Sequence, residues 1–288
     1  MSAGPITVVG SVNLDLVICS DRLPLAGETV LGGQFATHPG GKGANQALAA
    51  QRLGGEVRLI AAVGEDSEAK AALALLEAGG VDLGALIAYP EAKTGVALIC
   101  VDPAGENQIV VAPGANACLA ATDLPDRIDG ALIAQNEISL ETLEAAVERC
   151  AGFVALNLAP AMAMPDTVLA RADLLIVNET EAEFYGRDRL LASKRRVAIT
   201  LGARGAVLYQ DGVQTAQAAP PEVEVVDATG AGDTFVAALT LGLLEGHSDE
   251  DALRFACAAG ALATTRSGAQ PALPLRHEVA AKIPRTGP

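Results

Sequence analysis

The segment from Asp227 to Phe235 has the most direct chemical meaning in this chain, with the sequence Asp-Ala-Thr-Gly-Ala-Gly-Asp-Thr-Phe. Three small residues at 230–232 precede the carboxylate of Asp233, and an apolar helical pattern follows over 234–244. Glycines leave backbone N–H groups uncovered, and a helix start adds free N–H groups and the positive end of a dipole. Such a site attracts an anion. A carboxylate beside it predicts a base that takes a proton from a hydroxyl attacking a phosphoryl group.

Two polar clusters nearer the N-terminus could hold a sugar. Asn13 and Asp15 follow the first predicted strand, and their side chains could pair with adjacent hydroxyls, although a local turn is an equally good interpretation. The stretch Pro-Gly-Gly-Lys-Gly-Ala-Asn, which ends at Asn45, opens a predicted helix, and Lys42 and Asn45 would supply hydrogen bonds. The pattern matches neither the P-loop nor the dinucleotide-binding motif. A plain helix start needs fewer glycines than this stretch contains.

A third cluster, Asn178-Glu-Thr-Glu181, follows a predicted strand and begins a predicted helix. An amide and a carboxylate three residues apart share one face of a helix and suit a hydrated Mg²⁺ ion. An N-cap with acidic first-turn residues is the alternative, and it would be favoured if this motif stood alone.

The stretch Thr200-Leu-Gly-Ala-Arg-Gly205 ends another predicted strand. A glycine-rich loop after a strand, with the hydroxyl of Thr200 and the guanidinium of Arg204, suits the phosphates or ribose of a nucleotide. A tight turn into the next strand explains the same residues equally well.

Composition limits the classes of partner. The 288 residues carry a formal net charge of −15, which argues against a nucleic-acid partner and against binding to an anionic membrane surface. The five cysteines are scattered and form no C-x-x-C pair, so neither a disulfide framework nor a zinc site is indicated. The sequence shows no signal-peptide pattern and no run long enough to span a bilayer, so a reducing cytoplasm is the expected location.

Strand-like runs alternate with helical patterns along most of the chain, which predicts parallel strands joined by crossover helices in a doubly wound α/β sheet. The predicted strands lie at 6–10, 57–63, 131–134, 154–156, 174–177, 197–201 and 206–209, and the predicted helices at 44–53, 67–77, 140–149, 179–185, 234–244 and 249–265.

Two segments, 28–36 and 95–112, have strand-like residues and turn signals with no helix between them. They predict a small antiparallel sheet outside the main one, placed as a lid over the carboxyl ends of the main strands, where ligands bind in open α/β folds. The alternative is a pair of surface hairpins with no role in ligand binding. Alternating apolar residues at Val96, Leu98 and Cys100, and at Ile109 and Val111, suggest that one lid face covers the substrate and the other meets a second lid.

Each of these motifs alone is only moderately specific. Their order along the chain and their positions at strand ends, taken together, are highly specific. Together with Gly-Gly-Lys-Gly-Ala-Asn-Gln-Ala, Asn-Glu-Thr-Glu-Ala-Glu and Thr-Arg-Ser-Gly-Ala-Gln-Pro, they resemble the ribokinase (PfkB-type) family of carbohydrate kinases over nearly the whole chain. The resemblance implies one Rossmann-like domain over residues 1–288, into which the lid strands, from about 13–39 and 93–113, are inserted.

The resemblance also implies a role for each matching residue. The sugar would be held by Asn13, Asp15, Gly41, Lys42, Asn45 and Glu137, and phosphorylated with Asp233 as base and Gly230, Ala231 and Gly232 as the anion hole. ATP would lie along Thr200, Gly202, Arg204 and Gly205, near Asn178, Gly232 and Cys257, with Glu181 acting on Mg²⁺ indirectly. A K⁺ ion would be bound by Asp227, Thr229, Ala263, Arg266 and Gly268.

Several positions depart from the family pattern. Ala272 stands where the family usually has a serine at the cation site, so that site would lack one hydroxyl ligand, and Cys257 stands where a histidine or asparagine is common near the adenine. The stretches between 149 and 154 and between 185 and 197 are shorter than usual.

The activity implied is ATP-dependent phosphorylation of the 5-hydroxyl of D-ribose, assisted by Mg²⁺ and K⁺, in a homodimer joined through the lid. A nucleoside, 2-deoxyribose or another sugar remains open as the substrate. A non-catalytic sugar-binding regulator and a dinucleotide oxidoreductase are weaker alternatives, because the full anion hole with Asp233 is present and the dinucleotide motif is absent.

Overall fold

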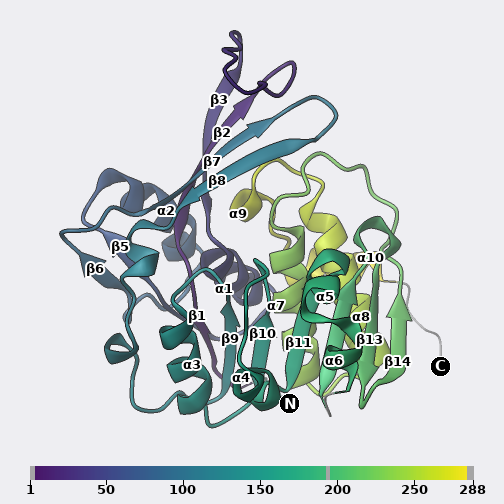
Figure 1. Ribbon diagram of the computed structural model, residues 1–288. Helices are drawn as coiled ribbons and strands as arrows, with labels where there is room; N and C mark the ends of the chain where they lie inside the picture. The colour runs from purple at the N-terminus through teal and green to yellow at the C-terminus, as the bar shows by residue number, and fades with distance from the viewer. Residues whose placement is uncertain (1–3, 193–194, 284–288) are drawn as a thin grey trace.

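An eight-stranded sheet divides the main body of the protein, and a second sheet projects from it (Figure 1). The computed structural model describes residues 4–192 and 195–283. The large sheet contains β1 (Ile6–Val9), β4 (Val57–Ile60), β9 (Ala131–Gln135), β10 (Val154–Asn157), β11 (Leu174–Asn178), β12 (Arg196–Thr200), β13 (Ala206–Gln210) and β14 (Val213–Ala218). Its strand order is β14-β13-β12-β11-β10-β9-β1-β4. The strands from β4 to β12 are parallel, and β13 and β14 continue the sheet in antiparallel pairing.

Helices cover both faces of this sheet. They are α1 (Lys42–Arg52), α2 (Ser67–Ala78), α3 (Leu140–Arg149), α4 (Asp166–Arg171), α5 (Glu179–Tyr185), α6 (Arg187–Leu191), α7 (Ala231–Leu244), α8 (Asp249–Ala263), α9 (Ala269–Ala272) and α10 (Arg276–Lys282). Successive strand residues such as Val8 and Val9 point to opposite faces, so Val8 packs with α1, α7 and α8 while Val9 packs with α3 to α6. Both layers are apolar, which is why the parallel strands read as continuous hydrophobic runs.

Most of the predicted elements are confirmed, and the helices predicted at 140–149 and 179–185 have the predicted bounds. The single strand predicted over 57–63 is wrong. β4 ends at Ile60, and a separate strand β5 (Ala62–Gly64) pairs with β6 (Ile87–Tyr89) in a small two-stranded sheet. The apolar run contains no glycine or proline at the break, so local sequence gives no sign that the chain changes sheets there.

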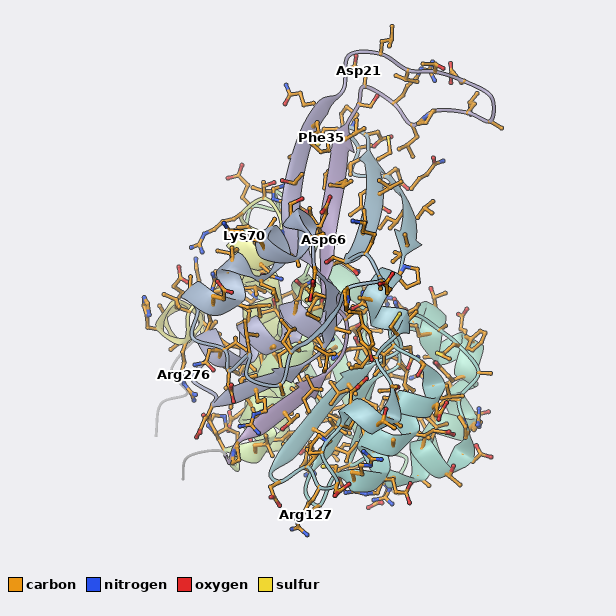
Figure 2. All side chains as sticks on the ribbon, turned by 90° about the vertical axis from the view of Figure 1, so that its left-hand side faces the viewer. Asp21, Phe35, Asp66, Lys70, Arg127 and Arg276 are labelled. Atoms are coloured by element: carbon orange, nitrogen blue, oxygen red, sulfur yellow. The ribbon has the colours of Figure 1, made fainter. Side chains whose placement is uncertain are left out.

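The projecting sheet forms the lid, and its strands are β2 (Asn13–Cys19), β3 (Gln34–Gly40), β7 (Gly95–Val101) and β8 (Asn107–Ala112), in the order β3-β2-β7-β8. Its two outer pairs are antiparallel as expected, whereas the central pair β2–β7 is parallel, so the lid is a mixed sheet. The strand predicted at 28–36 instead begins at Gln34 and runs to Gly40. Figure 2 shows Asp21 and Phe35 at the far end of the lid, away from Arg127 at the opposite end of the molecule.

The register of the lid decides which apolar side chains share a face. Asp15 lies opposite Ala97, which lies opposite Val111, so these residues face one way. Leu98 lies opposite Val110 and faces the other way. The predicted alternation is therefore present, with Ile109 and Val111 on the face that carries Asp15 and Leu98 on the outer face.

No helix within the described residues is both long enough and apolar enough to cross a membrane. The short stretch between residues 149 and 154 is a turn from α3 into β10, and β10 starts at Val154. In the other shortened stretch, α6 is described, but residues 193–194 lie outside the described part of the chain, as does the C-terminal end at 284–288.

Candidate active site

The first turns of α1 and α7 meet beneath the lid, and they bring together residues nearly 190 positions apart in sequence (Figure 1). Asp233, in the first turn of α7, is 7 % exposed. Its Oδ2 accepts a hydrogen bond from Nδ2 of Asn45 at 2.9 Å, and its Oδ1 accepts one from Nε2 of Gln46 at 2.9 Å. Burial raises the pKa of the Asp233 carboxyl, while Lys42 and the two amides act in the opposite direction. The carboxylate is fixed in orientation and made more basic than an exposed aspartate.

Acidic side chains surround Lys42. Burial alone would lower the pKa of Lys42, but the carboxylates around it, with Asp233 the strongest, outweigh burial and raise that pKa. Burial, with Glu137 and Asp233 nearby, raises the pKa of Asp15 to about 7. Glu137 is held by the Ser11 hydroxyl and by the backbone N–H of Lys42, which donates to its Oε2 at 3.1 Å. The charge of Lys42 therefore partly compensates the negative charge of the carboxylates in this cluster.

Asn13 is oriented by a residue that the sequence did not single out. Nδ2 of Asn116 donates to Oδ1 of Asn13 at 2.8 Å, and Oδ1 of Asn116 accepts from the backbone N–H of Val12 at 2.9 Å. With its oxygen engaged, Asn13 presents its amide N–H groups. Gly41 lets the start of α1 approach this strand, because it has a φ of 88° and a Cβ there would lie 2.7 Å from the backbone nitrogen of Asn13.

A cavity of about 370 Å³ opens beside Asn13 and Glu137. It lies between Val111 of the lid and the segment after β9, with Asn116 and Asn136 also on its wall. A small polar ligand could therefore contact the inner lid face and the carboxylate cluster at the same time.

The start of α7 leaves backbone N–H groups open. Gly230 has a φ of 79° and caps the helix, and a Cβ at this position would lie 3.0 Å from the side chain of Ala269. The N–H of Ala231 donates to the carbonyl of Ala228 at 3.2 Å, whereas the N–H groups of Gly232 and Asp233 have no acceptor among the described residues. The predicted anion hole is thus open at Gly232 and Asp233, and Ala231 is engaged in a turn.

Asp227 joins two segments that are distant in sequence. Its Oδ1 accepts hydrogen bonds from the backbone N–H of Thr229 at 2.9 Å and from the Thr229 hydroxyl at 2.6 Å. Its Oδ2 accepts from the backbone N–H of Gly268 at 2.8 Å. Burial would raise the pKa of Asp227, but these hydrogen bonds prevail and lower it. The loop before α7 and the loop after α8 are therefore clamped together.

The residues predicted to bind K⁺ lie at this clamp. Ala263 is the last residue of α8, where a helix leaves main-chain oxygens unpaired and partially negative. A guanidinium has no acceptor atom, so Arg266 could bind a cation only through its carbonyl, and its side chain pairs with Glu278 at 2.6 Å. Ala272 is fully buried and supplies no hydroxyl. The donor set is one of main-chain oxygens, which fits a weakly hydrated monovalent cation.

Asn178 and Glu181 form a reciprocal capping box at the start of α5. The N–H of Asn178 donates to Oε2 of Glu181 at 2.8 Å, and the N–H of Glu181 donates to Oδ1 of Asn178 at 2.8 Å. The helix-capping alternative is therefore present in the structure. The charge of Glu181 also favours the protonated form of Lys42 and so helps to raise the pKa of that lysine. No group of three or more His, Cys, Asp or Glu side chains suited to a metal ion occurs within 4–192 and 195–283.

The segment after β12 makes a tight turn. Thr200 donates weakly to the carbonyl of Val177 at 3.4 Å, and Gly202 begins a short 3₁₀ helix, Gly202–Arg204. Gly205 has a φ of 91°, and a Cβ there would lie 1.9 Å from the carbonyl oxygen of Ala218, so the turn requires glycine. The exposed Arg204 pairs with Glu179 at 2.6 Å. The turn alternative accounts for these glycines, while Arg204 stays at the surface beside the capping box.

Cys257 is part of the packing of α8. It is 5 % exposed, and its thiol lies 3.5 Å from the carbonyl oxygen of Ala218. Burial raises the pKa of the Cys257 thiol to about 12. These contacts favour a packing role over direct contact with a nucleotide.

Sequence reasoning missed the residues that orient the site from below. Asn116, Gln46, Gln135 and Asn157 are buried amides, and each contacts a predicted site residue or another member of this group. Of these four residues, only Gln46 belongs to a motif described above, the stretch Gly-Gly-Lys-Gly-Ala-Asn-Gln-Ala, and its spacing from the other site residues indicated no role.

Comparisons with known proteins find relatives over most of the chain. Residues 5–276 match the model of the pfkB family of carbohydrate kinases. The chain is 40 % identical to the ribokinase of Bacillus subtilis over an alignment of 288 positions, and this alignment covers 95 % of this chain and 97 % of that protein. It is 37 % identical to the ribokinase of Haemophilus influenzae, with 95 % and 96 % covered.

Solved structures of similar fold include the ribokinase of Thermotoga maritima, with a TM-score of 0.86, 34 % identity, and coverage of 96 % of this chain and 98 % of that one. The Arabidopsis thaliana ribokinase complexed with ribose and ATP has a TM-score of 0.81 and 31 % identity, with 97 % and 98 % covered. By the family match over most of its length, and by these relatives, the chain belongs to the pfkB family of carbohydrate kinases.

Proposed function

We propose that this chain is an ATP-dependent ribokinase, which converts D-ribose and ATP into ribose 5-phosphate and ADP. One observation carries the proposal: a buried carboxylate, Asp233, lies directly beside the open N–H groups of a helix start and within the carboxylate–lysine cluster. The names of the relatives at 37–40 % identity support ribose as the substrate. A cytoplasmic location remains an expectation from the sequence.

The transfer step follows from the position of Asp233. As the 5-hydroxyl oxygen of the sugar bonds to the γ-phosphorus, the bond from that phosphorus to the bridging oxygen breaks and its electron pair leaves with ADP. The hydroxyl proton passes to Asp233. In a loose transition state the proton leaves late, so the fixed orientation of this carboxylate matters more than its basicity.

The start of α7 and Lys42 would stabilise the transferred group. The N–H groups of Gly232 and Asp233, which have no acceptor among the described residues, would face the growing negative charge on its oxygens. Lys42 adds a positive charge within the cluster. Lid closure would exclude water, which competes with the sugar as acceptor.

Two groups of residues would hold the ions: the capping box at the start of α5 and the clamp around Asp227. When bound, Mg²⁺ neutralises phosphate charge, and Glu181 and Asn178 would hold its waters rather than the metal itself. When bound, K⁺ supplies a fixed positive charge to the main-chain oxygens around Asp227. In both places hydrogen bonds within this chain hold the residues near the ion: the capping box fixes Glu181, and the Asp227 clamp fixes the loop that leads into Gly230.

The sugar would be held by groups whose polarity is set by their neighbours. Asn13 offers N–H donors because Asn116 occupies its oxygen, and Asp15 offers a carboxylate acceptor. A sugar that lacks a hydroxyl would leave these buried groups unpaired, which is costly and gives selectivity.

Ribose binding is expected to weaken as the pH falls below about 7, because the pKa of Asp15 is about 7 and its protonated form loses acceptor capacity. The same raised pKa means that the contribution of Asp15 to stability is fully present below pH 3.8 and is lost as the pH rises through about 7. Calorimetric titration of ribose at a series of pH values checks the binding, with Asp15→Asn as the matched variant. An equally steep profile in Asp15→Asn would assign the effect to another group.

The outer face of the lid is proposed to join two copies of the chain. Leu98, Val110 and Phe35 on this face are 54 %, 68 % and 64 % exposed, which is a large apolar surface for a lone molecule. Leu98→Glu should therefore convert a dimer to a monomer in light scattering. Val213→Glu is the control, since Val213 is 67 % exposed but lies on β14, outside the lid. A wild-type protein that is a monomer at assay concentration would contradict the proposal.

A nucleoside kinase of the same family is the second candidate, because the cavity of about 370 Å³ beside Asn13 leaves space next to a bound sugar. An ADP-release assay with ribose, 2-deoxyribose, adenosine, cytidine and a hexose, each with and without K⁺, separates the candidates. Ribose should give the highest kcat/KM. A higher value with a nucleoside would overturn the assignment of ribose but leave the role of Asp233 untouched.

A further inference from the structure

Gln46 occupies a buried position between Asp233 and the large sheet. It belongs to the first turns of α1 and is fully buried. Its two amide N–H groups donate to Oδ1 of Asp233 at 2.9 Å and to Oδ1 of Asn157 at 3.1 Å. Its Oε1 accepts from Nε2 of Gln135 at 2.6 Å. All three polar contacts of Gln46 are thus made with groups that are themselves buried or nearly so.

Asp233 and Asn157 set the polarity of this network, because the Asp233 carboxylate accepts hydrogen bonds, and Nδ2 of Asn157 donates to the carbonyl of Ile176 at 3.4 Å, which leaves Oδ1 of Asn157 facing Gln46. If the Gln46 amide were turned over, its oxygen would face the Asp233 carboxylate and the Asn157 oxygen, and its nitrogen would face the donor of Gln135. Each contact would then place two groups of the same kind together. Asp233 and Asn157, the latter at the end of β10, therefore fix the direction in which Gln46 donates, and Gln135, at the end of β9, supplies the donor that holds its oxygen.

We propose that Gln46 is a positioning residue for the base: held by Gln135 and Asn157, it keeps Asp233 ionised and aimed at the acceptor hydroxyl. This inference rests on the proposed role of Asp233 in phosphoryl transfer. Asn45 supplies the second hydrogen bond, so the two carboxylate oxygens are each bound by one amide from α1. The sheet thus contacts the base through Gln46, while Asn45 and Lys42 act on the base from α1.

The charged groups around Asp233 define what a change at Gln46 would do. Lys42 of α1 favours the ionised carboxylate, and Glu137 after β9 and Asp15 of β2 oppose it. Glu181 of α5 acts on the same lysine. A negative charge added at position 46 would lie in direct contact with Asp233, and the two carboxyl groups would share a proton.

The test compares Gln46→Glu and Gln46→Met with wild type. In Gln46→Glu the acidic limb of the plot of kcat against pH should move to higher pH by about one unit or more, because an acceptor replaces a donor beside the base. In Gln46→Met, which is uncharged and similar in size, kcat should fall about tenfold with loss of one charge-assisted hydrogen bond. In both, the Kd for ribose should stay within about threefold of wild type, since Gln46 does not contact the sugar in this account.

Gln51→Glu is the matched control. Gln51 lies on the same helix and its oxygen accepts from the backbone N–H of Val57, so the same chemical change is made away from Asp233. Its pH profile should match wild type. If Gln46→Glu fails to give a cooperative thermal transition, Gln135→Met makes the test, because it removes the donor that orients Gln46 and should lower kcat without changing ribose binding.

The inference is overturned if Gln46→Glu and Gln46→Met retain the wild-type acidic limb and kcat, or if they weaken ribose binding and leave kcat unchanged. Asp233→Asn separates this outcome from failure of the proposed function. An inactive Asp233→Asn with a wild-type profile in Gln46→Glu refutes only the role of Gln46. An active Asp233→Asn refutes the base itself.

Discussion

Asp233→Asn is expected to reduce kcat by about 10³-fold or more while the Kd for ribose stays within about threefold of wild type. The amide cannot accept the hydroxyl proton, but it keeps the size of the side chain. It should also keep the local fold. Oδ1 of Asn45 has no hydrogen-bond partner in the part of the chain that the structure describes, so the Asn45 amide can turn over and accept from the new N–H group, while Gln46 still donates to the remaining oxygen.

Initial rates of ADP release and calorimetric titration of ribose measure the two quantities separately. Turnover close to wild type would remove Asp233 from the role of base. Loss of ribose binding together with turnover would show that the carboxylate mainly holds the sugar.

Lys42→Met is expected to have the second largest effect. The charge of Lys42 acts on Asp233, Glu137 and Asp15, and its removal leaves these carboxyl groups without that compensation. The carboxyl groups that remain would bind protons more readily, so the pKa of Asp233 and of Asp15 would rise further above their usual range. At neutral pH we expect kcat/KM to fall by about 10²-fold or more, and the acidic limb of its pH profile to move upward.

Lys70→Met is the control, since Lys70 is an exposed lysine on α2, away from this cluster (Figure 2). The control should match wild type in both rate and pH profile. A fall in kcat/KM with an unmoved acidic limb in Lys42→Met would mean that Lys42 acts on the phosphates alone and does not set the ionisation of the carboxylates.

The parts of the site that were predictable from sequence are those in which local chemistry is sufficient. A glycine, a small residue, a glycine and an aspartate before an apolar helix specify the start of α7 directly, because backbone freedom and helix geometry are local properties. The alternation of strands and helices likewise predicts a doubly wound sheet. For Asn178 and Glu181, local sequence supported both interpretations, and the structure shows the capping box.

The parts that were not predictable depend on contacts between distant segments. Gln46, Gln135 and Asn157 come from three elements, and no spacing along the chain reveals that their amides meet beneath Asp233. Asn116 is likewise more than 100 residues from the strand that it orients. The break at Ala61, where the chain leaves one sheet for another, lies inside an apolar run and is decided by which partner strand is available.

The central claim, that Asp233 accepts the proton as the 5-hydroxyl of ribose is phosphorylated, is tested most directly by ³¹P NMR of the complete reaction. Wild-type protein with D-ribose, ATP, Mg²⁺ and K⁺ should give one phosphate monoester, identical to ribose 5-phosphate, in an amount equal to the ADP formed. Asp233→Asn under the same conditions should give none above background. Inorganic phosphate as the only new signal, a monoester at another position, or equal ribose 5-phosphate from Asp233→Asn would contradict the claim.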